Sequence, residues 1–429
     1  MNEVRVPGDK SIAHRFLILA TLAEGESILS GMPASLDVNS TVACLRALGA
    51  NLEDEGDGLF RIQGPVRWRS PTESLDCGNS GTTARLLTGL LAGLGVEAEL
   101  RGDASLSRRP MDRVVYPLQA MGARIHYADR PDRLPLRVER RASGGLRALR
   151  YRPRVSSAQV RGALLLAALA SRTDLEILDR LRPRDHTERI LRSMGVPVVS
   201  EPAEDGERIR FRASRWNSDL SPLVAAVPGD LSSAAFLIVA ALLSSRNLTI
   251  RNVGLNPTRA GFLQVLSEVG AEVRVVETGL QAGEPVGDLS VSASTLHPFS
   301  VHEGLVPRLV DEVPVLAVLA SRIEGVSVFR GAGELRAKES DRLSLVASNL
   351  KTLGVRCDEL EDGLRVHGSL APVSGMVRAG GDHRIVMAFG ALGVAPGCEI
   401  TVDDPECVNV SFPGYWEAMA RLTSGKGPG

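Results

Sequence analysis

Six stretches of this chain are apolar on nearly every face of a helix, and each begins beside a serine or an aspartate. They start at Ser11, Ser80, Ser156, Ser232, Asp311 and Asp382, at intervals of 69 to 79 residues. A run of Ala, Leu and Val without a polar face predicts a helix that is buried all round. Ser and Asp are favoured N-cap residues. The pattern therefore predicts six buried helices that are capped at these positions.

A second phrase, amphipathic and ending in glycine, alternates with the apolar runs. It recurs as LRALGA, LQAMGA, LRSMGV, LSEVGA and LKTLGV, at 45–50, 118–123, 191–196, 266–271 and 350–355. Glycine at this place is typical of the left-handed position just after a helix. Strand-like stretches, such as 248–253 and 326–330, separate the phrases. Each repeat of roughly seventy residues therefore predicts the order strand, buried helix, strand, amphipathic helix, strand, strand.

The starts of two repeats that lie half a chain apart are nearly identical. Residues 6–11 read V-P-G-D-K-S and residues 227–232 read V-P-G-D-L-S. The sixth repeat stops after its second helix, at 415–422, and we expect the N-terminal strand 3–6 to supply what it lacks. The repeats predict two similar lobes of three βαβαββ units each, an α/β (α+β) architecture with buried helices. One lobe is expected to comprise 1–9 and 228–429, with both termini, and the inserted lobe to comprise 10–227.

Composition and charge exclude several classes of protein. The 429 residues carry 50 Lys and Arg against 51 Asp and Glu, a net charge of −1, which argues against a protein that coats nucleic acid or an anionic membrane. Lysine occurs only at positions 10, 338, 351 and 426, so nearly all basic residues are arginine. Aromatic residues make up 4% of the chain, so packing falls to Ala, Leu and Val.

Cysteine and histidine spacings give no sign of a disulfide framework or a metal site. The five cysteines form no C-x-x-C pair, which is typical of a reducing cytoplasm, and the seven histidines show no H-x-x-x-H or H-E-x-x-H spacing. The stretch G-N-S-G-T-T at 78–83 resembles a phosphate loop but lacks the Walker pattern. The longest apolar run, 234–243, is about half a membrane span. We expect a cytoplasmic protein without metal or cofactor.

Candidate chemistry gathers where the buried helices start. A helix N-terminus carries about half a positive charge and unpaired N–H groups, so several such ends facing one cleft would attract anions. Any single arginine here is consistent with a solvated surface residue, but the set favours binding of phosphate and carboxylate. The set comprises Lys10, Ser11, Arg15, Asn79, Gly81, Thr82, Arg85, Arg109, Ser156, Ser157, Gln159, Arg184, Lys338, Glu339, Arg342, Asp382, His383 and Arg384.

Two acids lie inside this basic set. Asp311 and Glu339 neighbour cations in the pattern, so they are candidates for proton transfer. Ion pairing that offsets the arginine charge explains them equally well, and the residues by themselves leave both roles open.

Eight motifs, in order along essentially the whole chain, resemble the 5-enolpyruvylshikimate-3-phosphate (EPSP) synthase family. They are P-G-D-K-S-I-A-H-R at 7–15, G-N-S-G-T-T-A-R-L at 78–86, S-R-R-P-M at 107–111, S-A-Q at 157–159, R-D-H-T-E at 184–188, D-E-x-P at 311–314, K-E-S-D-R-L at 338–343 and D-H-R at 382–384. The resemblance implies the enolpyruvyl transferase fold, an inside-out α/β barrel in each lobe, with the active site in the cleft between the lobes.

The resemblance also implies an activity. The family transfers the enolpyruvyl group of phosphoenolpyruvate to the 5-hydroxyl of 3-phosphoshikimate and releases phosphate, by addition and elimination through a tetrahedral intermediate. This 3-phosphoshikimate 1-carboxyvinyltransferase step belongs to the shikimate pathway, which leads to chorismate and aromatic amino acids, and it is the target of glyphosate. The implied partners are the two small substrates, without cofactor, metal, nucleic acid or membrane, and we expect a monomer.

Residue roles follow from the same resemblance. The implied catalytic residues are Lys10, Asp311 as the base for the 5-hydroxyl, and Glu339 as the acid for the methylene carbon. The implied ligands of 3-phosphoshikimate are Lys10, Ser11, Arg15, Ser157, Gln159, Asp311 and Lys338. Those of phosphoenolpyruvate are Lys10, Gly81, Arg109, Gln159, Arg342 and Arg384. Further candidates are Asn79, Thr82, Ser156, Arg184 and His383.

One departure and three alternatives complete the interpretation. Many members carry a lysine in C-x-x-K-[ST]-F-P, but residues 407–413 read C-V-N-V-S-F-P, with Val410 in its place. The nearest alternative is the related enzyme that transfers enolpyruvyl to UDP-N-acetylglucosamine, which usually offers a loop cysteine that 106–111 lacks. The scarcity of aromatic residues and the net charge of −1 argue against a nucleic-acid-binding protein. The third alternative is a pure binding or scaffold module, in which Asp311 and Glu339 would have no chemical role.

Overall fold

The computed structural model describes residues 2–141, 144–216 and 218–424, which form two compact units. The terminal unit comprises the described parts of Met1–Pro7, Pro228–Gly279 and Pro285–Gly429, and the inserted unit comprises Gly8–Val227 with Leu280–Glu284. The sequence boundaries differ at two places. Residues 8 and 9 belong to the inserted unit, because Asp9 caps a helix there, and so does the segment 280–284, because Glu284 pairs with His186.

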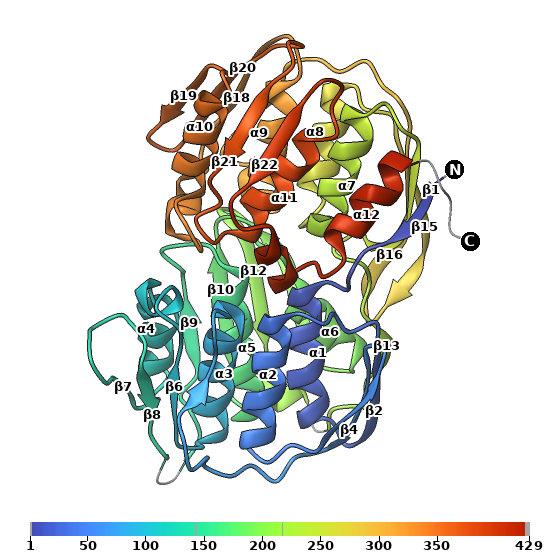
Figure 1. Cartoon of the computed structure of the whole chain (residues 1–429). Helices are drawn as coiled ribbons and strands as arrows, with labels where there is room; N and C mark the ends of the chain where they lie inside the picture. The colour runs from blue at the N-terminus through green and yellow to red at the C-terminus, as the bar shows by residue number, and fades with distance from the viewer. Residues whose placement is uncertain (1, 142–143, 217, 425–429) are drawn as a thin grey trace. The chain divides into compact units, whose positions relative to one another are not determined.

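The inserted unit contains three four-stranded sheets of the same topology (Figure 1). In each, a leading strand pairs in parallel with a second strand, and an antiparallel pair completes the sheet. In spatial order the first sheet is β13 (Val224–Ala226), β2 (Gly25–Ser30), β4 (Leu59–Gly64) and β3 (Leu52–Gly56). The second is β5 (Leu75–Asp76), β6 (Ala98–Arg101), β8 (Leu136–Val138) and β7 (Ile125–Tyr127). The third is β9 (Leu149–Tyr151), β10 (Leu175–Asp179), β12 (Gly206–Phe211) and β11 (Val198–Ala203).

The terminal unit repeats this topology twice and then shortens it. Its first sheet is β1 (Asn2–Arg5), β14 (Leu248–Gly254), β16 (Glu284–Val291) and β15 (Val273–Gln281). Its second is β17 (Ser300–Val301), β18 (Gly325–Phe329), β20 (Gly363–Gly368) and β19 (Cys357–Leu360). Its third is the two-stranded pair β21 (Ser374–Val377) and β22 (Glu399–Val402). The described strands thus form six separate small sheets, and none of these closes into a barrel.

The leading strands of two repeats are exchanged, and here the prediction for the N-terminal strand is wrong. Strand β1 pairs in parallel with β14, with Glu3 opposite Thr249, and does not join the sixth repeat. Strand β13 pairs in parallel with β2, with Val224 opposite Ile28. The cause lies in the two V-P-G-D turns. At each turn the chain passes from one unit to the other, so the strand before the turn stays with the unit that it leaves.

The six predicted buried helices are present (Figure 1), and most residues of each are buried. They are α1 (Lys10–Leu22), α3 (Gly81–Leu94), α5 (Ala158–Ala170), α7 (Leu231–Leu243), α9 (Val313–Ser321) and α11 (His383–Leu392). The second helices are α2 (Leu36–Ala47), α4 (Asp112–Ala120), α6 (His186–Ser193), α8 (Gly261–Val269), α10 (Arg342–Thr352) and α12 (Tyr415–Ser424). The five glycines after the LRALGA-type phrases have φ between 82° and 106°, which confirms their left-handed role.

The predicted N-caps are right at two of the six helices. Ser80 and Asp382 accept hydrogen bonds from backbone N–H groups of the helices that follow them. At the two V-P-G-D turns the caps are Asp9 and Asp230 in place of the serines two residues later, because these carboxylates reach the first free N–H groups. The remaining two caps lie one residue later than predicted, at Ser157 and Glu312, and neither side chain caps its own helix.

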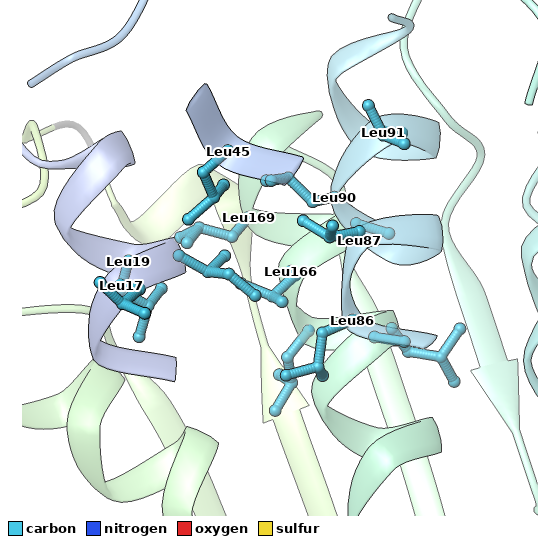
Figure 2. Packing of buried hydrophobic residues seen from close by; sticks show 14 of the residues in the cluster. Leu17, Leu19, Leu45, Leu86, Leu87, Leu90, Leu91, Leu166 and Leu169 are labelled. Atoms are coloured by element: carbon cyan, nitrogen blue, oxygen red, sulfur yellow. The ribbon is translucent and has the colours of Figure 1, made fainter. Parts of the chain in front are cut away.

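Small residues let the central helices of the inserted unit approach closely. A Cβ on Gly89 of α3 would lie 2.2 Å from the carbonyl oxygen of Ala163 in α5, and one on Gly93 would lie 2.6 Å from that of Ala167. Leucines of α1, α2, α3 and α5 fill the space around this contact (Figure 2). Close backbone contact and leucine packing explain how a core with few aromatics is filled. None of the helices in the described ranges is long and apolar enough to cross a membrane.

The contact between α3 and α5 gives the first testable prediction. Gly89→Ala should lower the free energy of unfolding by about 1–3 kcal/mol, because the added methyl overlaps the α5 backbone. This loss should appear although alanine is the better helix former. The measurement is the urea denaturation midpoint. Gly333→Ala is the control, because the nearest atoms to a Cβ there are 3.9 Å away. An unchanged or raised midpoint for Gly89→Ala would show that the helices can separate at no cost.

Candidate functional site

The first turn of α1 places a cation and two backbone N–H groups at one point. The Asp9 carboxylate accepts hydrogen bonds from the N–H groups of Ser11 at 2.7 Å and Ile12 at 3.2 Å. The Lys10 ammonium contacts Asp37 of α2 at 2.8 Å, and both side chains are only partly exposed. Lys10 is thus held in place by a carboxylate that no motif predicted.

Arg15, one turn later in α1, is buried and tied to two elements. Its Nε donates to the Thr187 hydroxyl at 2.7 Å, and a terminal nitrogen donates to the Ser11 carbonyl at 2.7 Å. Burial lowers the pKa of Arg15 to about 10, so the guanidinium stays charged at neutral pH. Arg184 is half-buried, and its positive charge acts on Arg15.

The motif R-D-H-T-E, at the start of α6, is anchored by a buried ion pair and a buried hydrogen bond. Glu188 contacts Arg161 of α5 at 2.5 Å, and both side chains are almost fully buried. His186 contacts Glu284 at 2.8 Å, again with both side chains buried. The motif therefore combines Thr187, which bonds Arg15, with flanking residues that hold α6 in place. Sequence reasoning missed Arg161 and Glu284 because neither lies in a motif.

The start of α3 is linked to the start of α5 by Arg85. Its guanidinium donates to the Gln159 side-chain oxygen at 2.7 Å and to the Pro110 carbonyl at 3.0 Å. The Gln159 amide in turn donates to the Thr82 hydroxyl at 2.9 Å. A Cβ on Gly81 would lie 2.6 Å from the Arg85 guanidinium, so the glycine leaves room for this link.

Arg109, Ser156 and Ser157 complete what we call the inserted-unit cluster. It comprises Lys10, Ser11, Arg15, Asn79, Gly81, Thr82, Arg85, Arg109, Ser156, Ser157, Gln159 and Arg184. Arg109 donates to the Asn79 side-chain oxygen at 2.6 Å. Ser156 donates to the Leu181 carbonyl at 2.9 Å. Ser157 stands at the N-cap of α5 without capping it, so its hydroxyl is not used by the helix.

In the terminal unit, Arg342 contacts three carboxylates. The arginine is fully buried at the start of α10, with its side chain 1% exposed. Its Nε contacts Asp382 at 2.8 Å, and its two terminal nitrogens contact Glu339 at 2.6 Å and Asp311 at 3.4 Å. Burial opposes the charge of Arg342, but the three carboxylates outweigh it and raise its pKa. Likewise, burial would raise the pKa of Asp382, but the charge of Arg342 holds it below its usual value.

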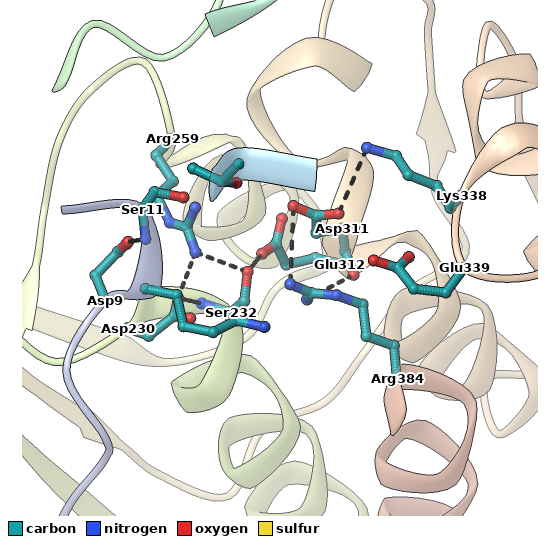
Figure 3. Close-up of polar contacts among 12 residues, drawn as sticks. Asp9, Ser11, Asp230, Ser232, Arg259, Asp311, Glu312, Lys338, Glu339 and Arg384 are labelled. Atoms are coloured by element: carbon teal, nitrogen blue, oxygen red, sulfur yellow. Dashed lines mark hydrogen bonds and ion pairs between the residues drawn. The ribbon is translucent and has the colours of Figure 1, made fainter. Parts of the chain in front are cut away.

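Asp311 is faced by three cations, two of which, Lys338 and Arg384, are labelled in Figure 3. Lys338 lies 3.9 Å and Arg342 3.4 Å from one carboxylate oxygen, and Arg384 lies 3.8 Å from the other. Arg384 also donates to the Asp311 carbonyl at 3.3 Å. We call Asp311, Lys338, Glu339, Arg342, Asp382 and Arg384 the terminal-unit cluster. His383 is buried next to Arg384, and Val410 ends a 3₁₀ turn, Pro405–Val410.

A buried polar group beside Asp311 was not predicted. Glu312 accepts a short hydrogen bond from Ser232 in the first turn of α7, and Arg259 donates to Ser232 at 2.9 Å and to Asp230 (Figure 3). Glu312 therefore ties the 3₁₀ turn Val310–Glu312, which carries Asp311, to α7. The sequence signals for this group were the second V-P-G-D turn and the glutamate of D-E-x-P, to which no role had been given.

Together, the described site residues suit anionic ligands and proton transfer. Each cluster combines arginines or lysines with helix N-termini, the groups that bind phosphate and carboxylate. Of the two clusters, the terminal-unit cluster places both candidate proton-transfer acids, Asp311 and Glu339, on one guanidinium. Across the described ranges, no group of three or more His, Cys, Asp or Glu could hold a metal ion.

Comparison with known proteins shows close and extensive similarity. The sequence model of the family described as EPSP synthase (3-phosphoshikimate 1-carboxyvinyltransferase) matches residues 1–419. The 3-phosphoshikimate 1-carboxyvinyltransferase of Thermus thermophilus is 46% identical over 425 residues, which cover 98% of this chain and 96% of that protein. The one from Parasynechococcus marenigrum is 43% identical over 424 residues, with 98% and 95% covered.

Solved structures show the same similarity at the level of the fold. The EPSP synthase of Acinetobacter baumannii matches with a TM-score of 0.85 and 34% identity, over 98% of this chain and 95% of that one. The enolpyruvyl transferase NikO of Streptomyces tendae matches with a TM-score of 0.75 and 19% identity, over 98% and 94%. The second likeness shows the fold alone.

A buried histidine among these elements gives the second prediction. His14 of α1 is 1% exposed, its ring bonds to the Thr41 hydroxyl at 2.7 Å, and burial lowers its pKa from 6.5 to about 3. In the unfolded chain His14 therefore takes up a proton near pH 6.5, whereas in the folded protein it does so only near pH 3. Stability should fall by about 1.4 kcal/mol per pH unit below 6.5, or about 2 kcal/mol at pH 5.

The measurement is the free energy of unfolding as a function of pH from 7.5 to 5. His14→Asn should lose this slope whatever its absolute stability, whereas the exposed His302→Asn should keep it. Equal slopes for the wild type and His14→Asn would mean that His14 is not held neutral by the fold.

Proposed function

The chain belongs to the EPSP synthase (3-phosphoshikimate 1-carboxyvinyltransferase) family, and from this premise we propose which described side chains carry out the reaction. The enzyme transfers the enolpyruvyl group of phosphoenolpyruvate to the 5-hydroxyl of 3-phosphoshikimate and releases phosphate. It is a transferase of the shikimate pathway, which leads to chorismate and the aromatic amino acids. The residue roles below are proposals that rest on the geometry of the two clusters.

The inserted-unit cluster is proposed to hold anionic groups of both substrates. Lys10, Ser11, Arg15, Ser157 and Gln159 bind 3-phosphoshikimate, with Asp311 and Lys338 of the terminal unit. The fixed orientation of Arg15 by Thr187, and of Gln159 by Arg85, supports this role, because a preoriented donor loses less freedom on binding.

Phosphoenolpyruvate is proposed to contact Lys10, Gly81, Arg109 and Gln159, together with Arg342 and Arg384. Asn79 and Thr82 support this role because they hold Arg109 and Gln159 by hydrogen bonds of 2.6 and 2.9 Å. Ser156, Arg184 and His383 remain proposals as further ligands. The lysine that many members carry at the place of Val410 is absent, so we assign no contact there.

Asp311 is proposed to be the base. The reaction needs a base for the proton of the 5-hydroxyl as that oxygen attacks C2 of phosphoenolpyruvate. Three cations lie 3.4 to 3.9 Å from the carboxylate oxygens of Asp311, and the same cations suit an anionic substrate. This geometry is the single observation that carries the assignment.

Glu339 is proposed to be the acid. Protonation of C3 accompanies attack at C2 and gives a tetrahedral intermediate that bears a methyl group. Loss of phosphate from C2 and of one proton from that methyl then restores the double bond in the product, and Glu339 takes this proton back. The hydrogen bond of 2.6 Å from Arg342 fixes one oxygen of Glu339, whose side chain is 27% exposed and thus accessible to substrate.

Location and assembly are also proposals. The described cysteines are all free, four of them buried, which supports a reducing compartment such as the cytoplasm. We propose that the protein works as a monomer, with no partner but its two substrates.

The experiment that tests the function is phosphate release from phosphoenolpyruvate in the presence of EDTA, with either acceptor. We expect turnover with 3-phosphoshikimate and none with UDP-N-acetylglucosamine. Turnover with the sugar nucleotide alone would assign the protein to the alternative enolpyruvyl transferase, and no turnover with either would refute the function.

The same assay tests the proton-transfer groups. Asp311→Asn and Glu339→Gln should each lower kcat by about 10²-fold or more, because each amide keeps the shape but cannot exchange a proton. Glu334→Gln is the matched control. This half-exposed carboxylate also contacts Lys338, at 3.6 Å, and its loss should change kcat by less than about twofold. A kcat that stays within this range for Asp311→Asn or Glu339→Gln would remove that residue from the mechanism.

A further inference from the structure

A buried chain of hydrogen bonds joins three helices of the inserted unit. His14 Nδ1 of α1 lies 2.7 Å from the Thr41 hydroxyl of α2, and that hydroxyl lies 2.7 Å from the Thr83 hydroxyl of α3. Thr83 donates to the Ser80 hydroxyl at 2.7 Å. All four side chains are at most 2% exposed. No motif role was assigned to His14, Thr41 or Thr83.

Counting hydrogens shows which group donates at each step of this row of hydrogen bonds. Each hydroxyl has a single hydrogen, and that of Thr83 is directed to Ser80. Thr41 then donates to Thr83, and His14 donates to Thr41 through Nδ1. The neutral state of the buried ring is consistent with this arrangement. Every donor in the chain therefore depends on the next acceptor, so one missing hydroxyl leaves two buried groups without a partner.

This row of hydrogen bonds runs between two helix starts, and both of these carry proposed substrate ligands. At one end, His14 lies in α1 between Lys10 and Arg15. At the other, Ser80 is the N-cap of α3 and is flanked by Asn79 and Gly81. Ser80 accepts from the Thr83 N–H at 3.1 Å as well as from its hydroxyl. Ser80 and Thr83 thus form both the N-cap of α3 and the last link in the row of hydrogen bonds.

Helix α2 connects the two ends through one face. Asp37 and Thr41 are four residues apart and so lie one above the other. Asp37 contacts Lys10 through its carboxylate at 2.8 Å, and its carbonyl lies 3.4 Å from the Thr83 hydroxyl. Thr41 makes the second connection, to His14 and Thr83. The hydrogen-bond path from α1 to α3 therefore runs through Thr41. Asp37 binds Lys10 of α1, and its carbonyl only lies near Thr83, whose hydrogen goes to Ser80.

We propose that His14, Thr41 and Thr83 are positioning residues for the reaction. They hold the first turn of α3, with Asn79, Gly81 and Thr82, in register with the first turn of α1, which carries Lys10. The consequence is a fixed separation between Lys10 and the α3 residues proposed for phosphoenolpyruvate. This inference rests on the proposed function and adds residues that touch neither substrate.

The test uses Thr83→Val, which keeps the shape and removes the hydroxyl, and Thr83→Ser, which keeps the hydroxyl. Thr88→Val in the same helix and Thr21→Val in α1 are the controls. Both threonines are fully buried, and each donates to a carbonyl of its own helix, at 2.7 and 2.6 Å. They should cost similar stability but leave α1 and α3 connected.

Thr83→Val should raise the KM for phosphoenolpyruvate about tenfold, the effect of one hydrogen bond, while kcat changes less. Thr83→Ser should restore the KM to within about twofold of the wild type, and both controls should stay within that range. Melting temperatures measured in parallel identify any loss that is merely structural. If Thr83→Val does not fold, Thr41→Val with Thr41→Ser provides the same comparison.

Two outcomes would overturn the positioning role. One is a KM for Thr83→Val equal to that for Thr88→Val at equal loss of melting temperature. The other is a Thr83→Ser variant as impaired as Thr83→Val, because the methyl group and not the hydroxyl would then matter. A wild type inactive with 3-phosphoshikimate refutes the proposed function itself, and with it the positioning role. Failure confined to the Thr83 comparison, with an active wild type, overturns the positioning role alone.

Discussion

The terminal unit depends on one buried charge, the guanidinium of Arg342. Removing an ion from water costs several kcal/mol, so the folded state must surround it with carboxylates in good geometry. Asp311, Glu339 and Asp382 come from three different elements: a 3₁₀ turn before α9, the loop before α10 and the N-cap of α11. Satisfying Arg342 therefore fixes the start of three helices at once. The same requirement places the proposed base and the proposed acid on one planar group.

Between the starts of α1 and α3, the inserted unit meets a similar requirement with neutral groups, whereas Arg161 and Glu188 form a buried ion pair between α5 and α6. There the starts of α1 and α3 are joined by a histidine and hydroxyls, and each cation is oriented by one or two fixed acceptors, as Arg15 is by Thr187. Both solutions need helices that start close together. The small residues between α3 and α5, and the leucines around them, allow this approach within a core poor in aromatics. The small and aliphatic residues that dominate the composition thus also allow the close helix packing on which the site depends.

Much of this arrangement could be predicted because it is local. The apolar runs and the glycines after the amphipathic phrases predicted the helices and the order of elements within a repeat. The exchange of β1 and β13 could not be predicted, because strand pairing is non-local and both turns have the same local sequence. Motif residues such as Arg342 were found, but Asp37 and Thr41 were not, and Glu312 of the D-E-x-P motif was given no role. Their role arises only from partners on other helices, and their residue types are ordinary for a helix start.

The central claim is that Arg342, besides the contact with phosphoenolpyruvate proposed above, acts on the reaction by holding the carboxylates of Asp311 and Glu339. A double-mutant cycle with Arg342→Lys and Glu339→Gln tests this most directly, since lysine keeps the charge but loses the planar fork. The measured quantity is kcat for phosphate release with both substrates saturating. If the two residues act as one unit, the double variant should be no more than about twofold slower than the slower single variant. A kcat reduced by the product of the two single effects would mean that Arg342 and Glu339 act independently, and would contradict the account.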